Sequence, residues 1–195
     1  MAKLYFRYGA MNCGKTRDLI KTHYNYMERN MKTIILKPGN DTKGGGTVVS
    51  RDSASLDTDF LISKTDNIYN IIGNYLIDNN LNCILVDEAQ FLEPHHIEEL
   101  TDVVDILDIP VICYGLRADF QSHLFPGSQR LFELADSIEE IKTVCDCGKK
   151  ATQNVRFING IVTFDGEQVA IDGENSITYT SKCRKCVKQL KRNLK

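Results

Sequence analysis

Over the first 135 residues, apolar positions follow two alternating patterns: short runs, and longer segments with helical spacing. The short runs predict strands at 3–8, 33–36, 83–86 and 110–114. The helical spacing predicts helices at 15–29, 66–76 and 94–107. Strands that alternate with amphipathic helices are typical of a parallel sheet covered on both faces. The expected fold class is therefore α/β.

Two regions depart from this alternation. Residues 40–55 are polar and include three consecutive glycines, so we expect a mobile loop without a regular element. After residue 135 the chain becomes β-rich, with a strand at 138–144 and a hairpin at 155–164 that turns at an Asn-Gly pair. The expected domains are an α/β domain over 1–140 and a small β-rich domain over 141–195.

The charge balance narrows the classes of function. The 195 residues carry 24 Lys and Arg against 26 Asp and Glu, a formal net charge of -2, which leaves no positive excess for a long run of phosphates. We therefore expect no nucleic-acid partner. No apolar run approaches the ~20 residues that span a bilayer, and the first residues lead into a strand pattern without a signal peptide. We expect no membrane partner and a soluble, cytoplasmic protein.

The segment after the first predicted strand carries the clearest chemical motif. It matches GxxxxGK[ST] and stands at the start of a predicted helix, which is the setting that the motif requires. The glycines let several backbone N–H groups face one phosphate, while Lys15 adds a positive charge and Thr16 offers a hydroxyl oxygen to Mg²⁺. A chance glycine-rich turn is the minor alternative. The predicted ATP- and Mg²⁺-binding residues of this phosphate loop are Gly9, Ala10, Met11, Asn12, Cys13, Gly14, Lys15 and Thr16.

An acidic motif follows the predicted strand at 83–86. Asp87 and Glu88 stand where that strand ends, and ligands gather at the carboxyl edge of a parallel sheet. Asp87 fits an acid that holds Mg²⁺, and Gln90 is grouped with it among the ATP- and Mg²⁺-binding residues. Glu88 has two interpretations: a general base for an attacking hydroxyl or water, or a solvated acid at a strand end. We favour the base because it would lie beside bound Mg²⁺.

These motifs indicate nucleotide binding and phosphoryl transfer but leave the acceptor open. A motor or helicase commonly needs a second lobe and a basic track, for which this chain lacks both length and charge. A GTPase switch would show a guanine-reading motif, and none is obvious. A small-molecule kinase needs an acceptor pocket, for which Phe120 and Phe125 are suited because they can stack on a flat heterocycle, with Met11 nearby. The two aromatic residues would equally suit a minor core beneath their loop.

The seven cysteines do not suit a disulfide framework, because their number is odd and three of them lie in apolar segments. The other four form two close pairs, Cys145 with Cys147 and Cys183 with Cys186. Four thiolates at two such corners suit tetrahedral Zn²⁺, and because four protein ligands leave no open position the predicted role is structural. Free thiols are the alternative, since the first pair is CxC and tighter than the usual CxxC. Zinc would tie the intervening segment at both ends as a lid over the substrate.

Four strings resemble the type II, zinc-bearing thymidine kinases in order and spacing: YFRYGAMNCGKT, LVDEAQF, YGLRADF and CRKC. The resemblance implies a P-loop NTPase-type sheet flanked by helices, with a small zinc-bearing domain whose long loop is called the lasso. It also implies transfer of the γ-phosphate of ATP, with Mg²⁺, to the 5′-hydroxyl of thymidine and of deoxyuridine. Glu88 would be the base that acts on this hydroxyl. A cytoplasmic homotetramer is implied by the resemblance alone, and the end product dTTP is a candidate feedback inhibitor.

The resemblance also assigns a substrate pocket. The side chains that match those around the base and on the lasso are Met11, Leu116, Phe120, Phe125 and Tyr179. Arg51 has two interpretations, a group that reaches the substrate phosphates or a solvated loop charge. The segment 171–178 is longer than the family pattern before the tyrosine, so the family's backbone contacts are not carried over to it.

A binding module is the rival from another class of function. In that interpretation the protein is an ATP-loaded switch, and the loop that carries Phe120 and Phe125 grips a protein partner. Transfer of labelled phosphate from ATP to a nucleoside separates the kinase from the switch, because a switch transfers none.

Overall fold

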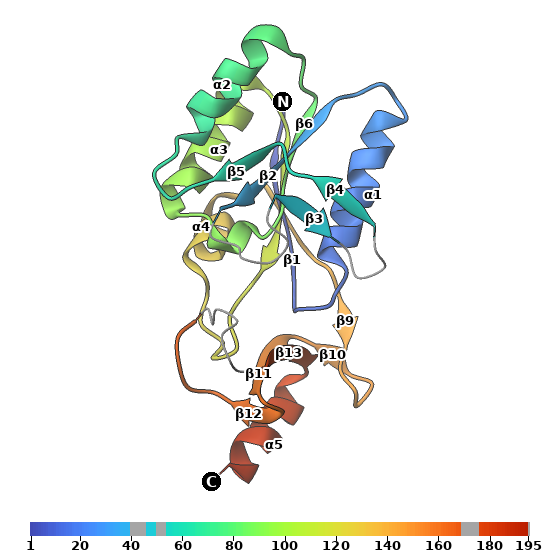
Figure 1. Ribbon diagram of the computed structural model, residues 1–195, viewed down its shortest axis with the longest axis vertical. Coiled ribbons are helices and arrows are strands. Elements are labelled where there is room, and N and C mark those ends of the chain that lie inside the picture. Colours follow the sequence, from blue (N-terminus) through green and yellow to red (C-terminus); the bar gives the residue numbers. More distant parts are fainter. Residues whose placement is uncertain (40–45, 50–53, 169–175, 195) are drawn as a thin grey trace.

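A computed structural model describes residues 1–39, 46–49, 54–168 and 176–194. Six parallel strands form the central sheet in the order β5-β2-β6-β7-β1-β8 (Figure 1). These strands are β1 Leu4–Gly9, β2 Thr33–Pro38, β5 Phe60–Ile62, β6 Cys83–Val86, β7 Val111–Leu116 and β8 Ser137–Glu140. The predicted fold class, α/β with a parallel sheet, is confirmed.

Helices cover both faces of this sheet (Figure 1). They are α1 Lys15–Met27, α2 Ile68–Asp78, the short 3₁₀ helix η1 Ala89–Phe91, α3 Pro94–Leu107 and α4 Pro126–Leu134. The helix α1 covers one face, while α2, α3 and α4 cover the other. In the described part of the chain, no helix combines the length and the apolar character that a bilayer crossing requires.

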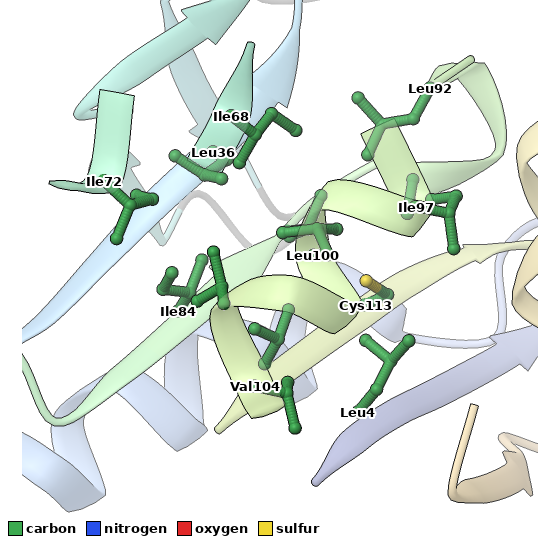
Figure 2. Packing of buried hydrophobic residues seen from close by; sticks show 14 of the residues in the cluster. Leu4, Leu36, Ile68, Ile72, Ile84, Leu92, Ile97, Leu100, Val104 and Cys113 are labelled. Carbon is green, nitrogen blue, oxygen red and sulfur yellow. The ribbon is translucent and has the colours of Figure 1, made fainter. Parts of the chain in front are cut away.

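The two cores follow from the alternation of side chains along each strand. Ile35 packs with Leu19 of α1, whereas its neighbours Ile34 and Leu36 join the larger core under α2 and α3. Figure 2 shows this larger core, in which strand side chains such as Ile84 meet those of both helices. Burial on both faces explains why the central strands appear in the sequence as continuous apolar runs.

The C-terminal region forms two small sheets and a helix, separate from the central sheet (Figure 1). Its elements are β9 Thr143–Val144, β10 Lys150–Ala151, β11 Gln153–Ile158, β12 Ile161–Thr163, β13 Ile177–Lys182 and α5 Arg184–Asn193. The predicted hairpin is confirmed, because Ile158 pairs with Ile161 across a two-residue turn. In that turn Asn159 has φ 51° and Gly160 has φ 79°, the left-handed conformation that such turns require.

The expectation of a loop without regular structure over 40–55 is wrong where the chain is described. Strands β3 (Thr47–Val49) and β4 (Ser55–Asp57) form an antiparallel hairpin. The side chain of Val48 is only 1% exposed and joins the core under α1, against which Leu56 also packs. Burial against the rest of the domain therefore outweighs the local preference of a glycine-rich segment for a loop.

The single strand expected at 138–144 is also wrong, because the chain changes sheets within it. Strand β8 pairs with β1 in the central sheet, whereas β9 pairs with β10. Between them the Ile141 N–H donates to the Tyr8 carbonyl oxygen at 2.7 Å, the last such bond before the chain leaves the sheet. The sequence pattern cannot show this change, because the partner strand lies at the other end of the domain.

We propose the same division into domains, 1–140 and 141–195. It is supported by the sheet topology, because the last strand of the central sheet ends at Glu140. The helix α4 was not predicted, since nine residues that begin with Pro126-Gly127 are too few to show a helical period. The strand β13 and the helix α5 were not predicted either.

Candidate active site and metal centre

The phosphate loop connects β1 to α1 and folds back tightly on itself. Asn12 and Gly14 have positive φ angles of 65° and 87°. A Cβ added to Gly9 would lie 2.4 Å from Cys13 Sγ, so only glycine fits there. Lys15 is buried, and its Nζ donates to the Ala10 carbonyl oxygen at 3.2 Å. The loop thus holds an ammonium group beside a helix N-terminus, an arrangement suited to phosphate.

The acidic pair stands two strands away from this loop. The sheet order β6-β7-β1 places Asp87 and Glu88, which follow β6, at the same carboxyl edge as the loop after β1. Burial and the neighbouring Glu88 raise the pKa of Asp87 to about 7, while the positive charges of Lys37 and Lys15 oppose this shift. Asp87 therefore lies within electrostatic reach of the phosphate loop, and a further cation beside it would favour its ionised form.

The sequence interpretation missed Lys37, which lies next to the end of β2. Its side chain is 2% exposed, and its Nζ lies 3.3 Å from the Thr47 carbonyl oxygen, to which it donates. A buried ammonium group requires nearby negative charge or acceptors, and Asp87 is one such charge. The only sequence signal for this position of Lys37 is that a lysine stands at the end of a buried strand.

Gln90 connects Glu88 to the neighbouring strand. Its Nε2 donates to Glu88 Oε2 at 2.5 Å, and its Oε1 accepts the Leu116 N–H at 2.9 Å. Glu88 itself adopts a left-handed backbone conformation with φ 48°. Such a conformation is rare for residues other than glycine and is concentrated at functional sites. The carboxylate of Glu88 is therefore held by both its backbone and its partner.

Among the residues predicted to form the base pocket, Leu116, Phe120 and Phe125 are buried, whereas Met11 and Tyr179 are half-buried. Phe125 makes an edge contact with Phe91, with ring centroids 5.5 Å apart, and Leu116 and Phe120 are also buried. The Leu116 carbonyl oxygen accepts the Ser128 hydroxyl at 2.5 Å, which fixes the loop to the start of α4. This burial is consistent with both interpretations of the loop, stacking on a base and a minor core, so the pocket stays a prediction.

Asn154 of β11, which the sequence interpretation also missed, joins the two loops of the site. Its Oδ1 accepts the Met11 N–H at 2.8 Å, and its Nδ2 donates to the Ala118 carbonyl oxygen at 2.9 Å. One side chain from the C-terminal region thus bridges the phosphate loop and the acceptor loop, residues 116–125. No local motif marks it, because its partners lie far away in the sequence.

Arg156, two residues further along the same strand, lies against Phe120. Its guanidinium carbon is 3.6 Å from the Phe120 ring centroid, and its side chain is 2% exposed. It donates to the carbonyl oxygens of Asp165 and Glu167 at 2.7 and 2.9 Å. Tyr179 is its register partner on β13, so their side chains share one face of the strand pair.

Arg51 lies outside the described residues, and so does most of the segment 171–178.

The four cysteines predicted to hold a metal come together at one corner. The sulfurs of Cys145, Cys147, Cys183 and Cys186 all lie within 4.8 Å of one another, and those of Cys147 and Cys183 are 3.6 Å apart. A tetrahedral zinc ion with Zn–S distances of about 2.3 Å sets its sulfurs about 3.8 Å apart. The spacing of the four sulfurs therefore fits a tetrahedral metal ion, and no disulfide joins them.

The pKa shifts of these thiols also fit a shared metal site. Burial opposes ionisation of Cys145, but the backbone N–H groups of Cys147 and Cys183 lower its pKa to about 6. Hydrogen bonds with its neighbours, Cys147 first, raise the pKa of Cys186 to about 12. Such opposite shifts are expected where several thiols share one place, and a metal cation would allow all four to bind as thiolates.

Comparison with known proteins adds the family. The family model for thymidine kinase matches residues 2–187. The thymidine kinase of Mannheimia succiniciproducens is 47% identical over 191 residues, which cover 97% of this chain and 96% of that protein. The corresponding figures are 48%, 94% and 87% for the thymidine kinase of Rhodopirellula baltica, and 47%, 95% and 96% for that of Shewanella oneidensis. Since the match spans the phosphate loop, the acidic pair, the acceptor loop and the cysteine cluster, the chain belongs to the thymidine kinase family.

Proposed function

We propose that this protein transfers the γ-phosphate of ATP to the 5′-hydroxyl of thymidine, giving dTMP for the salvage of pyrimidine deoxynucleosides. The observation that carries the proposal is the shared carboxyl edge of the sheet, which holds a phosphate loop and a fixed Glu88 in a chain of the thymidine kinase family. Deoxyuridine is included as a second acceptor, because it differs from thymidine only by the absence of one methyl group.

In the proposed reaction Glu88 acts as the general base. Its carboxylate accepts the proton of the 5′-hydroxyl while the hydroxyl oxygen bonds to the γ-phosphorus of ATP. The bond from that phosphorus to the β–γ bridging oxygen breaks, and ADP leaves. Lys15 stabilises the negative charge that spreads over the phosphate oxygens. Gln90 holds the carboxylate in place through its hydrogen bond.

Thr16 and Asp87 are the residues that would hold Mg²⁺. When it is bound, Mg²⁺ neutralises charge on the phosphate oxygens. The chemistry of this pair supports the assignment, because hydroxyl and carboxylate oxygens are the ligands that Mg²⁺ prefers. Asp87 is buried with a raised pKa, so a divalent cation beside it would restore its ionised form.

The proposed thymidine site lies between the phosphate loop, the acceptor loop and the lasso. Its side chains are Met11, Leu116, Phe120, Phe125 and Tyr179. This assignment is supported by the hydrogen bonds of Asn154, which link the strand β11 to Met11 and to Ala118. Arg51 stays a prediction for the phosphate end of the substrate.

We propose zinc as the ion of the four-cysteine cluster, with a structural role. Four thiolates suit Zn²⁺ and leave no coordination position for a substrate. The cluster connects the start of α5 to the turn between β9 and β10, on either side of the lasso. Ordering a loop costs about 1–2 kcal/mol per residue, so a metal tether at both ends offsets part of that cost.

Transfer of labelled phosphate tests the proposed function directly. The purified protein is incubated with Mg²⁺ and γ-labelled ATP, separately with thymidine, deoxyuridine, deoxycytidine, deoxyadenosine and deoxyguanosine. We expect label in the monophosphates of thymidine and deoxyuridine, and none with the Lys15→Ala variant. Absence of transfer to every nucleoside would contradict the kinase and favour the ATP-loaded switch.

A cytoplasmic homotetramer stays a prediction, as does feedback by dTTP. Sedimentation equilibrium of the purified protein measures the number of chains in the assembly. Addition of dTTP to the thymidine assay measures the inhibition. We expect dTTP to compete with whichever substrate, thymidine or ATP, shares its binding site.

A further inference from the structure

A cavity of about 770 Å³ lies on the C-terminal region, and neither the phosphate loop nor Glu88 lines it. It is bounded by α5, which lies at the lower end of Figure 1, by the turn that leads into β10, and by the beginning of the acceptor loop. We call it the basic pocket. Pockets of 300–1,000 Å³ are the usual size for small-molecule ligands.

The lining of the basic pocket is strongly cationic. The helix α5 contributes Arg184, Lys185, Lys188 and Arg192. The remaining cationic side chains are Arg117, Lys149 and Lys150. None of the described residues that line the pocket is acidic. This concentration contrasts with the whole chain, whose formal net charge is -2.

The cations of α5 are arranged in a way that raises their mutual repulsion. Arg184, Lys188 and Arg192 are spaced four residues apart and therefore share one face of the helix. Like charges at this spacing destabilise a helix, and α5 contains no acidic residue to offset them. An anion bound in the basic pocket would remove this repulsion.

Nearby negative charge does not neutralise all the cationic side chains that line the basic pocket. Four thiolates around a divalent ion carry two net negative charges, and Glu140 pairs with Lys150 at 2.6 Å. Among the seven cationic side chains, Lys150 alone pairs with an acid in the part of the chain that the structure describes. In the described part of the chain, the side chains of Lys149, Arg184, Lys188 and Arg192 form no ion pair with an acid.

We propose that the basic pocket is a second anion site, which binds a small polyphosphate such as the phosphate chain of a nucleoside triphosphate. Guanidinium groups bind phosphate through two parallel hydrogen bonds, and lysines add point charges. Thr152 and Gln153 line the same pocket and add polar groups that can accept or donate hydrogen bonds. A nucleic acid is the less suitable ligand, because it needs an extended basic track, whereas these cations surround one concave site.

The position of Arg117 links this pocket to the acceptor loop. Its Nη2 donates to the Thr152 carbonyl oxygen at 3.1 Å, and it directly follows Leu116 in the chain. An anion in the basic pocket would therefore contact side chains of both the acceptor loop and the C-terminal region. Binding of the anion itself needs no turnover, so this proposal and the proposed kinase activity can fail independently.

Equilibrium dialysis with labelled inorganic tripolyphosphate tests the proposal. The full chain is compared with Lys15→Ala, which weakens the phosphate loop, and with Lys188→Gln/Arg192→Gln, which weakens the basic pocket. We expect two classes of site in the unaltered protein and one in each variant. In the Lys15→Ala background, Lys188→Gln/Arg192→Gln should weaken the remaining binding by roughly tenfold or more, because it removes two charge-assisted contacts.

The matched control is Lys21→Gln/Arg29→Gln, which removes the same charges from exposed positions in and beside α1. It should leave both sites intact. Far-UV circular dichroism and the melting temperature show that Lys188→Gln/Arg192→Gln is folded, independently of any kinase activity. A single class of site in the unaltered protein, or two unchanged classes in Lys188→Gln/Arg192→Gln, would overturn the proposal.

Two further ligands identify the source of the phosphate. In the Lys15→Ala background, tighter binding of ATP than of tripolyphosphate assigns the pocket to nucleoside triphosphates, and equal binding assigns it to the phosphate chain alone. A single-stranded oligodeoxyadenylate that binds this pocket more tightly than tripolyphosphate would overturn the small-anion site in favour of a nucleic-acid site.

Discussion

At the scale of single residues, the candidate base is fixed by neighbours that the sequence does not place beside it. Glu88 has a left-handed backbone, and its carboxylate accepts a hydrogen bond from Gln90, which is itself anchored to the Leu116 N–H. A carboxylate held in this way needs little reorganisation before it accepts a proton. Its geometry, more than its position after a strand, distinguishes it from a solvated acid.

The Glu88→Gln variant tests this role. Glutamine keeps the shape and the hydrogen bond but cannot accept the proton, so we expect kcat for thymidine phosphorylation to fall by roughly 10² or more. Steady-state kinetics measures this change, with the exposed Glu28→Gln variant as the matched control. An unchanged kcat would remove Glu88 from the role of base.

Arg156 gives a second prediction at this scale. Its guanidinium lies over the Phe120 ring and donates to two carbonyl oxygens of the lasso. Lysine keeps the charge but lacks the planar fork, and a desolvated cation–π contact contributes about 2 kcal/mol. We expect Arg156→Lys to raise KM for thymidine by roughly tenfold and to leave KM for ATP almost unchanged.

The exposed Arg29→Lys variant is the control for this measurement. Equal increases in both KM values would indicate a general loss of structure and would contradict a positioning role for Arg156.

At the scale of elements, the start of α3 depends on a neutral histidine. The His96 Nδ1 accepts the Glu93 N–H at 3.2 Å, and its Nε2 lies 3.1 Å from the Asp66 carbonyl oxygen. Only the neutral ring with its proton on Nε2 satisfies both partners. The first turn of the helix is therefore coupled to the residues before α2.

This coupling predicts a pH dependence of stability. Burial, followed by the nearby His95, lowers the pKa of His96 below its ordinary value of 6.5, against the opposing effect of Glu99. The unfolded chain therefore binds a proton at a higher pH than the folded chain does. The contribution of His96 to stability is complete above the unfolded pKa, and is lost as the pH falls below about 6.5 toward the folded pKa.

Thermal unfolding between pH 7 and pH 5 measures this effect. We expect the melting temperature to fall over this range, and to fall less in His96→Gln than in the unaltered protein. His123→Gln is the matched control, because it removes an exposed histidine of the acceptor loop and leaves both hydrogen bonds of His96 and the neighbouring His95 in place. An identical pH profile in His96→Gln would show that other groups carry the dependence.

At the scale of the whole molecule, the central sheet and the C-terminal region are joined by hydrogen bonds of individual side chains, while the four cysteines all lie within the C-terminal region. Asn154 forms hydrogen bonds with Met11 and with Ala118. Arg117 donates to the Thr152 carbonyl oxygen, and the Gln153 side chain donates to the Ser122 hydroxyl. Among the described residues of the C-terminal region, the hydrophobic cluster is small, with Cys145, Ala151 and Cys183 as its buried members, whereas the two cores of the central sheet are larger. Metal binding is therefore expected to supply much of the order of this region.

Removal of the metal tests this dependence. We expect about one zinc per chain in the purified protein, and loss of both zinc and thymidine binding in Cys183→Ser. ATP binding should change less, because the phosphate loop belongs to the central sheet. The control is Cys83→Ala, which removes a core thiol outside the cluster and should retain zinc. A metal-free protein with full thymidine binding would contradict the structural role.

Much of the fold and part of the site could be predicted from local patterns. The continuous apolar runs became the central strands, and the phosphate motif formed the tight loop before α1 because glycine and a helix start are local properties. The hairpin at Asn159-Gly160 formed for the same reason. The errors at 47–49 and 138–144 arose where burial or a distant partner strand decided the outcome.

The sequence by itself determined the α/β class, the phosphate loop, the acidic pair and the two closely spaced pairs of cysteines, because each consists of adjacent or regularly spaced residues. Only the tertiary structure decided that Asn154 bridges two loops, that Arg156 lies on Phe120 and that cations from three segments surround one pocket. These contacts join residues far apart in the chain, and their energy depends on distance in space and on burial, which no local pattern of residues specifies.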